Sequence, residues 1–161
     1  MKVAAALALD SNLLLLYVVG RASPSYIAKH KRLYPKYTEA DFDLLVKQLN
    51  KFSVLLLTPN TVSEVSNLID YIGNPARTHI YTVLHEMLKS LPLFEERYVP
   101  SIAASNRLEL AQLGITDCAL LTLSAEGIAL LTVDIKLYIA ASRLNENTMN
   151  FTHLQEANFG Y

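Results

Sequence analysis

Short apolar runs alternate with longer amphipathic stretches along the chain, and this alternation predicts the fold class. Three of the runs are too short for helices and aliphatic enough for strands buried on both faces. These runs are residues 2–9, 52–57 and 128–133. Helices are predicted at 13–19, 38–51, 58–72, 77–90 and 108–113, and after Asp117 and Asp134. Alternating strands and helices predict one α/β domain, with three layers (α/β/α) and a mostly parallel central sheet.

Local signals predict where two of the helices begin and end. Asp10 or Ser11 can cap the first helix, because a short polar side chain at that position accepts from a free backbone N–H. Gly20 is expected to end this helix. Thr38 and Asp41 have the spacing of a capping box, which predicts the start of the second helix.

Three stretches have weaker patterns. Residues 21–37 form a polar segment bracketed by Pro24 and Pro35 that shows no core-facing stripe, and one or two helical turns are expected between the two prolines. Residues 98–99 are interpreted as either a short strand or a connection. Near the end of the chain, 149–151 is expected to form an edge strand, after which the tail frays.

The amino-acid composition limits the classes of protein to which the chain can belong. The 161 residues are 52% hydrophobic and 18% charged, which suits a single well-packed core, and the net charge of −1 predicts no general attraction to nucleic acid. The only cysteine, Cys118, has no internal disulfide partner and is expected in a buried helix. Because Asp10 interrupts the first apolar run and no run approaches membrane-spanning length, we expect a cytoplasmic protein without membrane association.

Four acidic residues are predicted to meet at one edge of the sheet. Asp10 and Asp134 each follow a predicted strand, so both lie at the carboxyl ends of the strands. Glu64 lies in the first turns of the helix after the second strand, at the same edge. Asp117 opens the helix that runs antiparallel to the third strand, which again places it there.

Carboxylates gathered at one place repel each other unless a cation neutralises them. Oxygen ligands of this kind select Mg²⁺ or Mn²⁺. Such an ion can activate a water molecule and hold a phosphate oxygen, so the predicted chemistry is phosphodiester hydrolysis.

Four stretches of the chain resemble the PIN-domain family of metal-dependent ribonucleases, which includes VapC-like toxins of toxin–antitoxin pairs. They are LALDSNLLL at 7–15, TPNTVSEVSNL at 58–68, LGITDCALL at 113–121 and LLTVDIKLYIAAS at 130–142. The resemblance covers most of the chain, in the order of the family, and implies a PIN-like fold.

The resemblance also implies an activity and a site. The implied catalytic and metal-binding residues are Asp10, Glu64, Asp117 and Asp134, with Thr132 and Asn12 supporting them. The implied activity is endonucleolytic cleavage of RNA that leaves a 5′-phosphate. The expected partners are an RNA substrate, an antitoxin or other protein, and a second copy of the chain.

Each of these residues has a purely structural interpretation as well. Acids are common at helix starts, and Thr61 with Glu64 also has capping-box spacing. Thr132 can be a satisfied polar residue at a strand end, and Asn12 can belong to an ordinary turn.

Other functions are compatible with the same pattern. An inactive PIN-like scaffold could bind protein or RNA, and the same acids could cleave structured DNA. A phosphate-accepting receiver-like domain would use a lysine at this edge, where Lys136 stands, but the sequence lacks the acidic pair that such domains carry after the first strand.

Residues 26–37 mix tyrosines with basic side chains, a combination that contacts phosphates and stacks on unpaired bases. Lys31 and Arg32 are the predicted RNA contacts, and a solvated loop is the alternative. His79, His85 and His153 lack metal-ligand spacing and are interpreted as structural.

Overall fold

Five strands, all parallel, form the central sheet of the computed structural model, which describes residues 3–90 and 93–160. The spatial order of the strands is β3-β2-β1-β4-β5. Their bounds are β1 Val3–Leu9, β2 Phe52–Leu57, β3 Phe94–Glu96, β4 Ala129–Thr132 and β5 Thr148–Asn150. The predicted α/β class with a parallel sheet is therefore confirmed.

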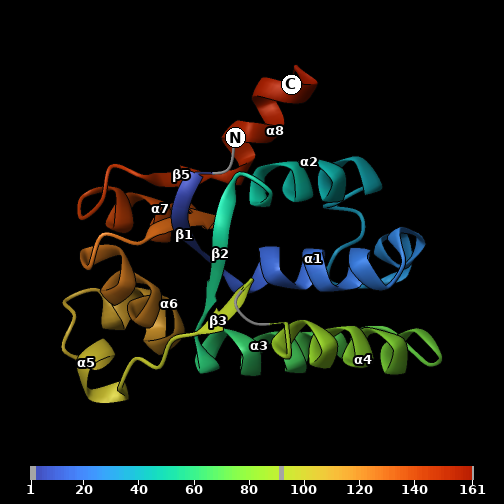
Figure 1. The fold of residues 1–161 in the computed structure, drawn as a ribbon, viewed down its shortest axis with the longest axis horizontal. Helices are drawn as coiled ribbons and strands as arrows, with labels where there is room; N and C mark the ends of the chain where they lie inside the picture. The colour runs from blue at the N-terminus through green and yellow to red at the C-terminus, as the bar shows by residue number, and fades with distance from the viewer. Residues whose placement is uncertain (1–2, 91–92, 161) are drawn as a thin grey trace.

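Helices cover both faces of the sheet, so the domain has three layers (Figure 1). One layer holds α1 Ser11–Ala22, the 3₁₀ helix η1 Pro24–Lys29, α2 Glu39–Leu49, α3 Pro59–Ile69 and α4 Ala76–Leu88. The other layer holds α5 Ser101–Ser105, α6 Leu110–Ala125 and α7 Ile135–Ser142. Within the described residues, no helix is both long and apolar enough to span a membrane.

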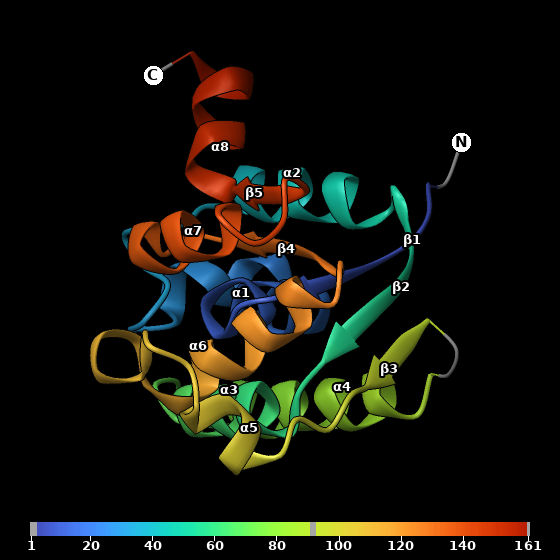
Figure 2. The same ribbon diagram turned by 90° about the vertical axis from the view of Figure 1, so that its left-hand side faces the viewer.

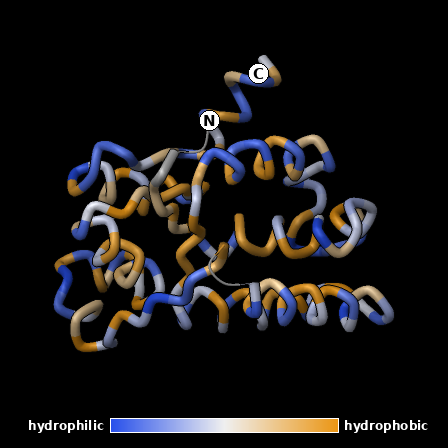
Figure 3. Tube along the Cα trace, viewed as in Figure 1, coloured by the Kyte–Doolittle hydropathy of each residue, from blue (hydrophilic) through white to orange (hydrophobic). Residues whose placement is uncertain are grey.

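The sheet divides the core into two clusters, because successive side chains of a strand point to opposite faces. Leu7 and Leu9 of β1 belong to the larger cluster, which α1 supplies with a nearly continuous apolar surface (Figure 3). Ala8 faces the smaller cluster, with Cys118 and Leu130. The predicted burial of Cys118 is confirmed.

The order in which the strands are added to the sheet reverses between β1 and β4. From β1 it proceeds outward to β2 and β3, and it then returns to the other side of β1 to form β4 and β5. Ala8 pairs with Leu56 of β2 and with Leu130 of β4, so β1 is the central strand. In open α/β sheets, ligands bind beyond the carboxyl ends of the strands at such a reversal.

Two predicted features of the first half are confirmed. The strand at 52–57 has the bounds expected from the sequence. The capping box also forms, since Thr38 N donates to Asp41 Oδ2 over 2.8 Å and Asp41 N donates to Thr38 Oγ1 over 3.4 Å. The first predicted strand is seen from Val3, and its residue 2 lies outside the described residues.

The prediction that Gly20 ends the first helix is wrong. Helix α1 continues through Gly20 to Ala22, and its C-cap is Ser23. A Cβ atom at position 20 would collide with the ring of Phe42. This glycine allows α1 and α2 to approach closely, and sequence spacing alone cannot distinguish that role from a helix end.

The prediction that residues 21–37 lack a core face is also wrong. Ile27, Leu33 and Tyr37 are buried in the larger cluster, and His30 is fully buried beside them. Their spacing is irregular because the segment contains a 3₁₀ helix followed by turns, so neither helical nor strand periodicity reveals them.

The structure after residue 90 decides two further predictions. Residues 98–99 form a connection, which is one of the two interpretations that the sequence allowed, whereas strand β3 was not predicted. The tail does not fray after its edge strand, because Asn150 caps helix α8 Phe151–Phe159 by accepting from Thr152 N over 2.9 Å. Helix α8 extends away from the body of the molecule (Figure 2), and only its first residue is buried.

Candidate active site

Asp10 is a buried carboxylate held by three hydrogen bonds. It directly follows β1 and caps α1, with Leu13 N donating to Oδ1 over 2.8 Å. Its Oδ2 accepts from Val133 N over 2.8 Å and from the Thr132 hydroxyl over 2.6 Å. Burial raises the pKa of Asp10, although these hydrogen bonds act in the opposite direction.

Thr132 links Asp10 to Asp134. Its fully buried hydroxyl donates to Asp10 and accepts from Asp134 N over 3.0 Å. Asp134 in turn caps α7, since Leu137 N donates to its Oδ1 over 2.9 Å. One hydroxyl therefore fixes the relative positions of the two acids that follow the central strands β1 and β4.

Asp117 lies in the first helical turn after a break in α6. Gly114 interrupts that helix with a φ of 81°, a conformation that side-chain-bearing residues rarely adopt, and the helix resumes directly before Asp117. The helix predicted to open at Asp117 resumes after Gly114, two residues earlier than expected. The break therefore leaves Asp117 near a helix start.

The charge environment of Asp117 brings the four predicted acids together. Burial and, in decreasing order, the negative charges of Asp134, Asp10 and Glu64 together raise the pKa of Asp117 to about 7. Four elements far apart in the sequence thus place their carboxyl groups within electrostatic reach of one another.

Glu64 is exposed on α3 and does not cap that helix. The N-cap is Thr58, whose hydroxyl accepts from Thr61 N over 3.1 Å, so the predicted capping box of Thr61 and Glu64 does not form. Glu64 lines a shallow pocket together with Asn60, Asn67 and Thr116, the residue that precedes Asp117. Its carboxylate is therefore left free at the rim of the site.

Asp117 and Asp134 line a second, polar pocket directly beside it. Asn12 of α1 also lines this pocket, which supports its predicted place in the site. Two lysines that the sequence analysis did not assign to the site, Lys36 and Lys136, line it as well. The sequence placed Lys136 at this edge only as part of the receiver-like alternative, whereas only the folding of residues 23–37 brings Lys36 to this edge.

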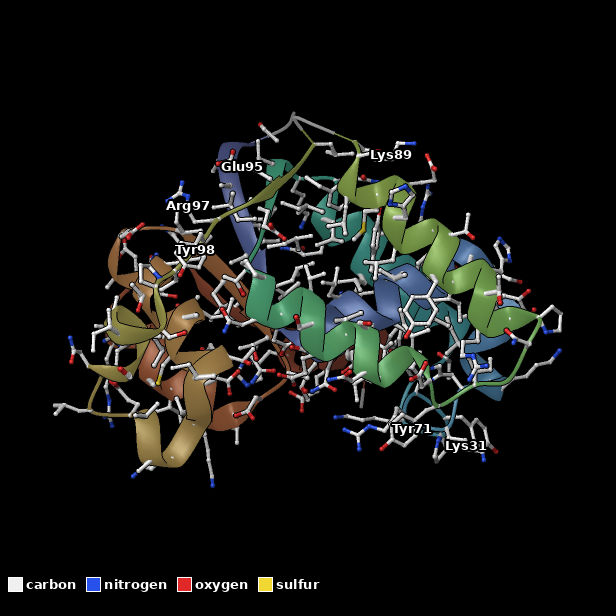
Figure 4. All side chains as sticks on the ribbon, turned by 90° about the horizontal axis from the view of Figure 1, so that it is seen from below. Lys31, Tyr71, Lys89, Glu95, Arg97 and Tyr98 are labelled. Atoms are coloured by element: carbon white, nitrogen blue, oxygen red, sulfur yellow. The ribbon has the colours of Figure 1, made fainter. Side chains whose placement is uncertain are left out.

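Lys31 and Arg32, the predicted RNA contacts, line neither of these two pockets. Lys31 N donates to Tyr71 O over 3.2 Å, and the Arg32 guanidinium stands 5.7 Å from the centre of the Tyr71 ring. Tyr71 follows the end of α3, and Figure 4 shows Lys31 beside it. Neither basic residue lines a pocket that contains the acids, so their contact with RNA stays a prediction.

Two of the three histidines interpreted as structural pack against aromatic rings. His79 packs edge-to-face against Tyr26, and His153 does the same against Tyr138. In the described part of the chain, no group of three or more His, Cys, Asp or Glu side chains has the arrangement of a metal site.

The donor chemistry nevertheless suits a hard cation. Asp117 and Glu64 accept no hydrogen bond from any described residue, so their oxygens are free, whereas Asp10 is already oriented. Like charges at this range repel, which favours separated carboxylates in the absence of a cation. The four acids fit Mg²⁺ or Mn²⁺ in ligand type, but their spacing is wider than that of a closed metal cage.

Comparison of the chain with protein-family models, with curated proteins and with solved structures gives no significant match. The resemblance to PIN domains therefore rests on the four quoted stretches alone.

Proposed function

We propose that this protein is a Mg²⁺- or Mn²⁺-dependent endoribonuclease of the PIN-domain type, and the toxin of a toxin–antitoxin pair. The observation that carries the proposal is the convergence of Asp10, Glu64, Asp117 and Asp134 beyond the carboxyl ends of β1 and β4. Only Asp10 and Asp134 cap helices, so capping does not explain why all four acids share one charge environment at the reversal point of the sheet.

Two of the four acids are held in place by hydrogen bonds, and the other two are not. Asp10 and Asp134 would hold the ion from fixed positions, since backbone N–H groups and the Thr132 hydroxyl restrain them. Asp117 and Glu64 would complete the oxygen set. When bound by these residues, such an ion would supply an activated water molecule and neutralise charge on the scissile phosphate. Thr132 is a positioning residue in this scheme, because it acts through Asp10 and Asp134.

The decisive experiment replaces Asp117 by asparagine, which keeps the shape of the side chain and removes its charge. We expect Asp117→Asn to lose at least hundredfold in the rate of RNA cleavage with Mn²⁺, about 2.7 kcal/mol of barrier. The matched control is Asp43→Asn, because Asp43 is an exposed acid on α2 outside both pockets. Cleavage by Asp117→Asn at the parental rate would refute the proposal.

The same assay separates RNA from DNA as the substrate. A single-stranded DNA of the same base sequence should be cut much more slowly, and its products and those of RNA should be examined for a 5′-phosphate. A structured DNA is tested in parallel, and cleavage of either DNA as fast as the RNA would replace the proposed ribonuclease by a general nuclease, which the same acids support.

The second candidate function is a non-catalytic module that binds a protein partner. It is favoured by large apolar side chains exposed on α5, α7 and the connection before α6, where Leu108 is 99% exposed and Ile102 71%. Heating the purified protein with and without Mn²⁺ distinguishes the two functions. Stabilisation by Mn²⁺ in the parent but not in Asp117→Asn supports the nuclease, because a ligand of the folded state raises its stability.

A further inference from the structure

The pocket that holds Asp117 and Asp134 also contains two positive charges. Lys36 enters from the segment before α2, and Lys136 from the first turn of α7. Both side chains are exposed. Within the described residues, neither lysine forms an ion pair, although carboxylates line the same pocket. Their ammonium groups are therefore available to an anion.

Lys36 is held beside the acids by its neighbour. Its Nζ lies 5.3 Å from the centre of the Tyr37 ring, and the Tyr37 side chain is buried in the core. Burial and the charges of Asp10 and Asp41 raise the pKa of Tyr37, which places that ring within electrostatic reach of Asp10. The aromatic face attracts the cation and restricts where the lysine can move.

We propose that Lys36 and Lys136 bind the backbone phosphates of the RNA strand that the acids cleave, an inference that rests on the proposed nuclease function. The carboxylates would hold the metal ion, and the two ammonium groups would neutralise the negative charge of the phosphates of the strand. A pocket lined only by acids would repel RNA, because each nucleotide brings a negative charge. The two lysines therefore let an acidic site accept an anionic polymer.

The alternative to phosphate binding is that the two lysines only reduce the electrostatic repulsion among the carboxylates. The two interpretations differ in how RNA binding depends on salt. A lysine that contacts a phosphate releases a counterion on binding, so its loss lowers the slope of log K against log salt by about 0.7 for a single strand. A lysine that acts only on the acids leaves this slope unchanged.

The experiment measures binding of a short, fluorescein-labelled single-stranded RNA by fluorescence anisotropy over a range of salt concentrations, with Ca²⁺ in place of Mg²⁺. Binding is recorded without reference to cleavage, so its result is independent of the catalytic test. Lys36→Met and Lys136→Met should each weaken binding several-fold and lower the slope by about 0.7. Lys36→Arg should restore most of the loss, because it keeps the positive charge.

The matched control is Lys47→Met. Lys47 is an exposed lysine near the C-terminal end of α2 and lies outside both acidic pockets. Parental affinity and slope in both pocket variants would overturn the inference, as would a parent protein that does not bind RNA. Thermal unfolding of each variant confirms that the loss of binding does not come from misfolding.

Discussion

The sheet has one edge at the amino ends of its strands and one at their carboxyl ends, and the side chains at these two edges differ in polarity. At the amino edge, the hollow is lined mainly by apolar residues, including Phe52, Ile128 and Met149. At the carboxyl edge, beyond the other ends of the central strands, the hollow is lined mainly by polar residues, which include two acids and two lysines. The difference shows that the fold itself separates an apolar edge from an edge that gathers charged side chains.

Backbone polarity explains the contrast. At the carboxyl edge the helices α1 and α7 begin, and their free N–H groups stabilise negative charge. Asp10 and Asp134 each accept from such a group, from Leu13 and Leu137. At the amino edge α6 ends near Gly127 and turns back into β4, so the backbone there presents carbonyl groups and offers no equivalent stabilisation for an acid.

The largest effect that tests this contrast is a pH dependence of stability at the carboxyl edge. Because the pKa of Asp117 in the fold is about 7, the folded protein keeps a proton that the unfolded chain releases above its ordinary value of 3.8. The stability of the metal-free protein should therefore fall by roughly 1–3 kcal/mol as the pH rises from about 4 to about 7. Urea unfolding in EDTA at several pH values measures this fall.

Asp117→Asn provides the comparison, since it cannot ionise. Its stability should depend less on pH over the same window, and the difference between the two proteins isolates the contribution of Asp117. If both proteins show the same pH dependence, the crowding of negative charge at the carboxyl edge is weaker than the contacts indicate.

The next largest effect is a loss of Mn²⁺ affinity on substitution of Thr132. Thr132→Val keeps the shape of the side chain but removes the hydroxyl that joins Asp10 to Asp134, and it should weaken Mn²⁺ binding by about tenfold. Thr132→Ser should retain most of the affinity, because it keeps the hydroxyl. Titration of Mn²⁺ by calorimetry compares the two variants, and equal affinities would assign Thr132 to the fold alone.

The smallest effect is expected at the amino edge. Met149→Ala removes a partly buried side chain that accepts from Gln48 Nε2 through its sulfur over 3.2 Å, and should cost about 1 kcal/mol of stability. Mn²⁺ binding should not change. Denaturant unfolding and the Mn²⁺ titration are the measurements, and altered metal affinity would show that the two edges are coupled.

Particular residues show how far sequence reasoning reached. The acids Asp10 and Asp134 were predictable, because each follows an apolar strand and begins a helix, and these are local signals. Gly20 was misinterpreted, since a glycine that admits a neighbouring ring resembles one that ends a helix. Lys36 belongs to the basic, tyrosine-rich stretch 26–37, but the sequence did not place it beside the acids, because residues 21–37 have no regular period.

The hydrophobic pattern by itself determined the α/β class, the central strands and the edge at which the acids lie, because strand length, helix period and capping are encoded in neighbouring residues. Only the tertiary structure decided the strand order, the bond from Thr132 to Asp10 across 122 positions, and the arrival of Lys36 beside Asp134. These features depend on which distant surfaces pack together, and packing is a property of the whole core that no local stretch of sequence contains.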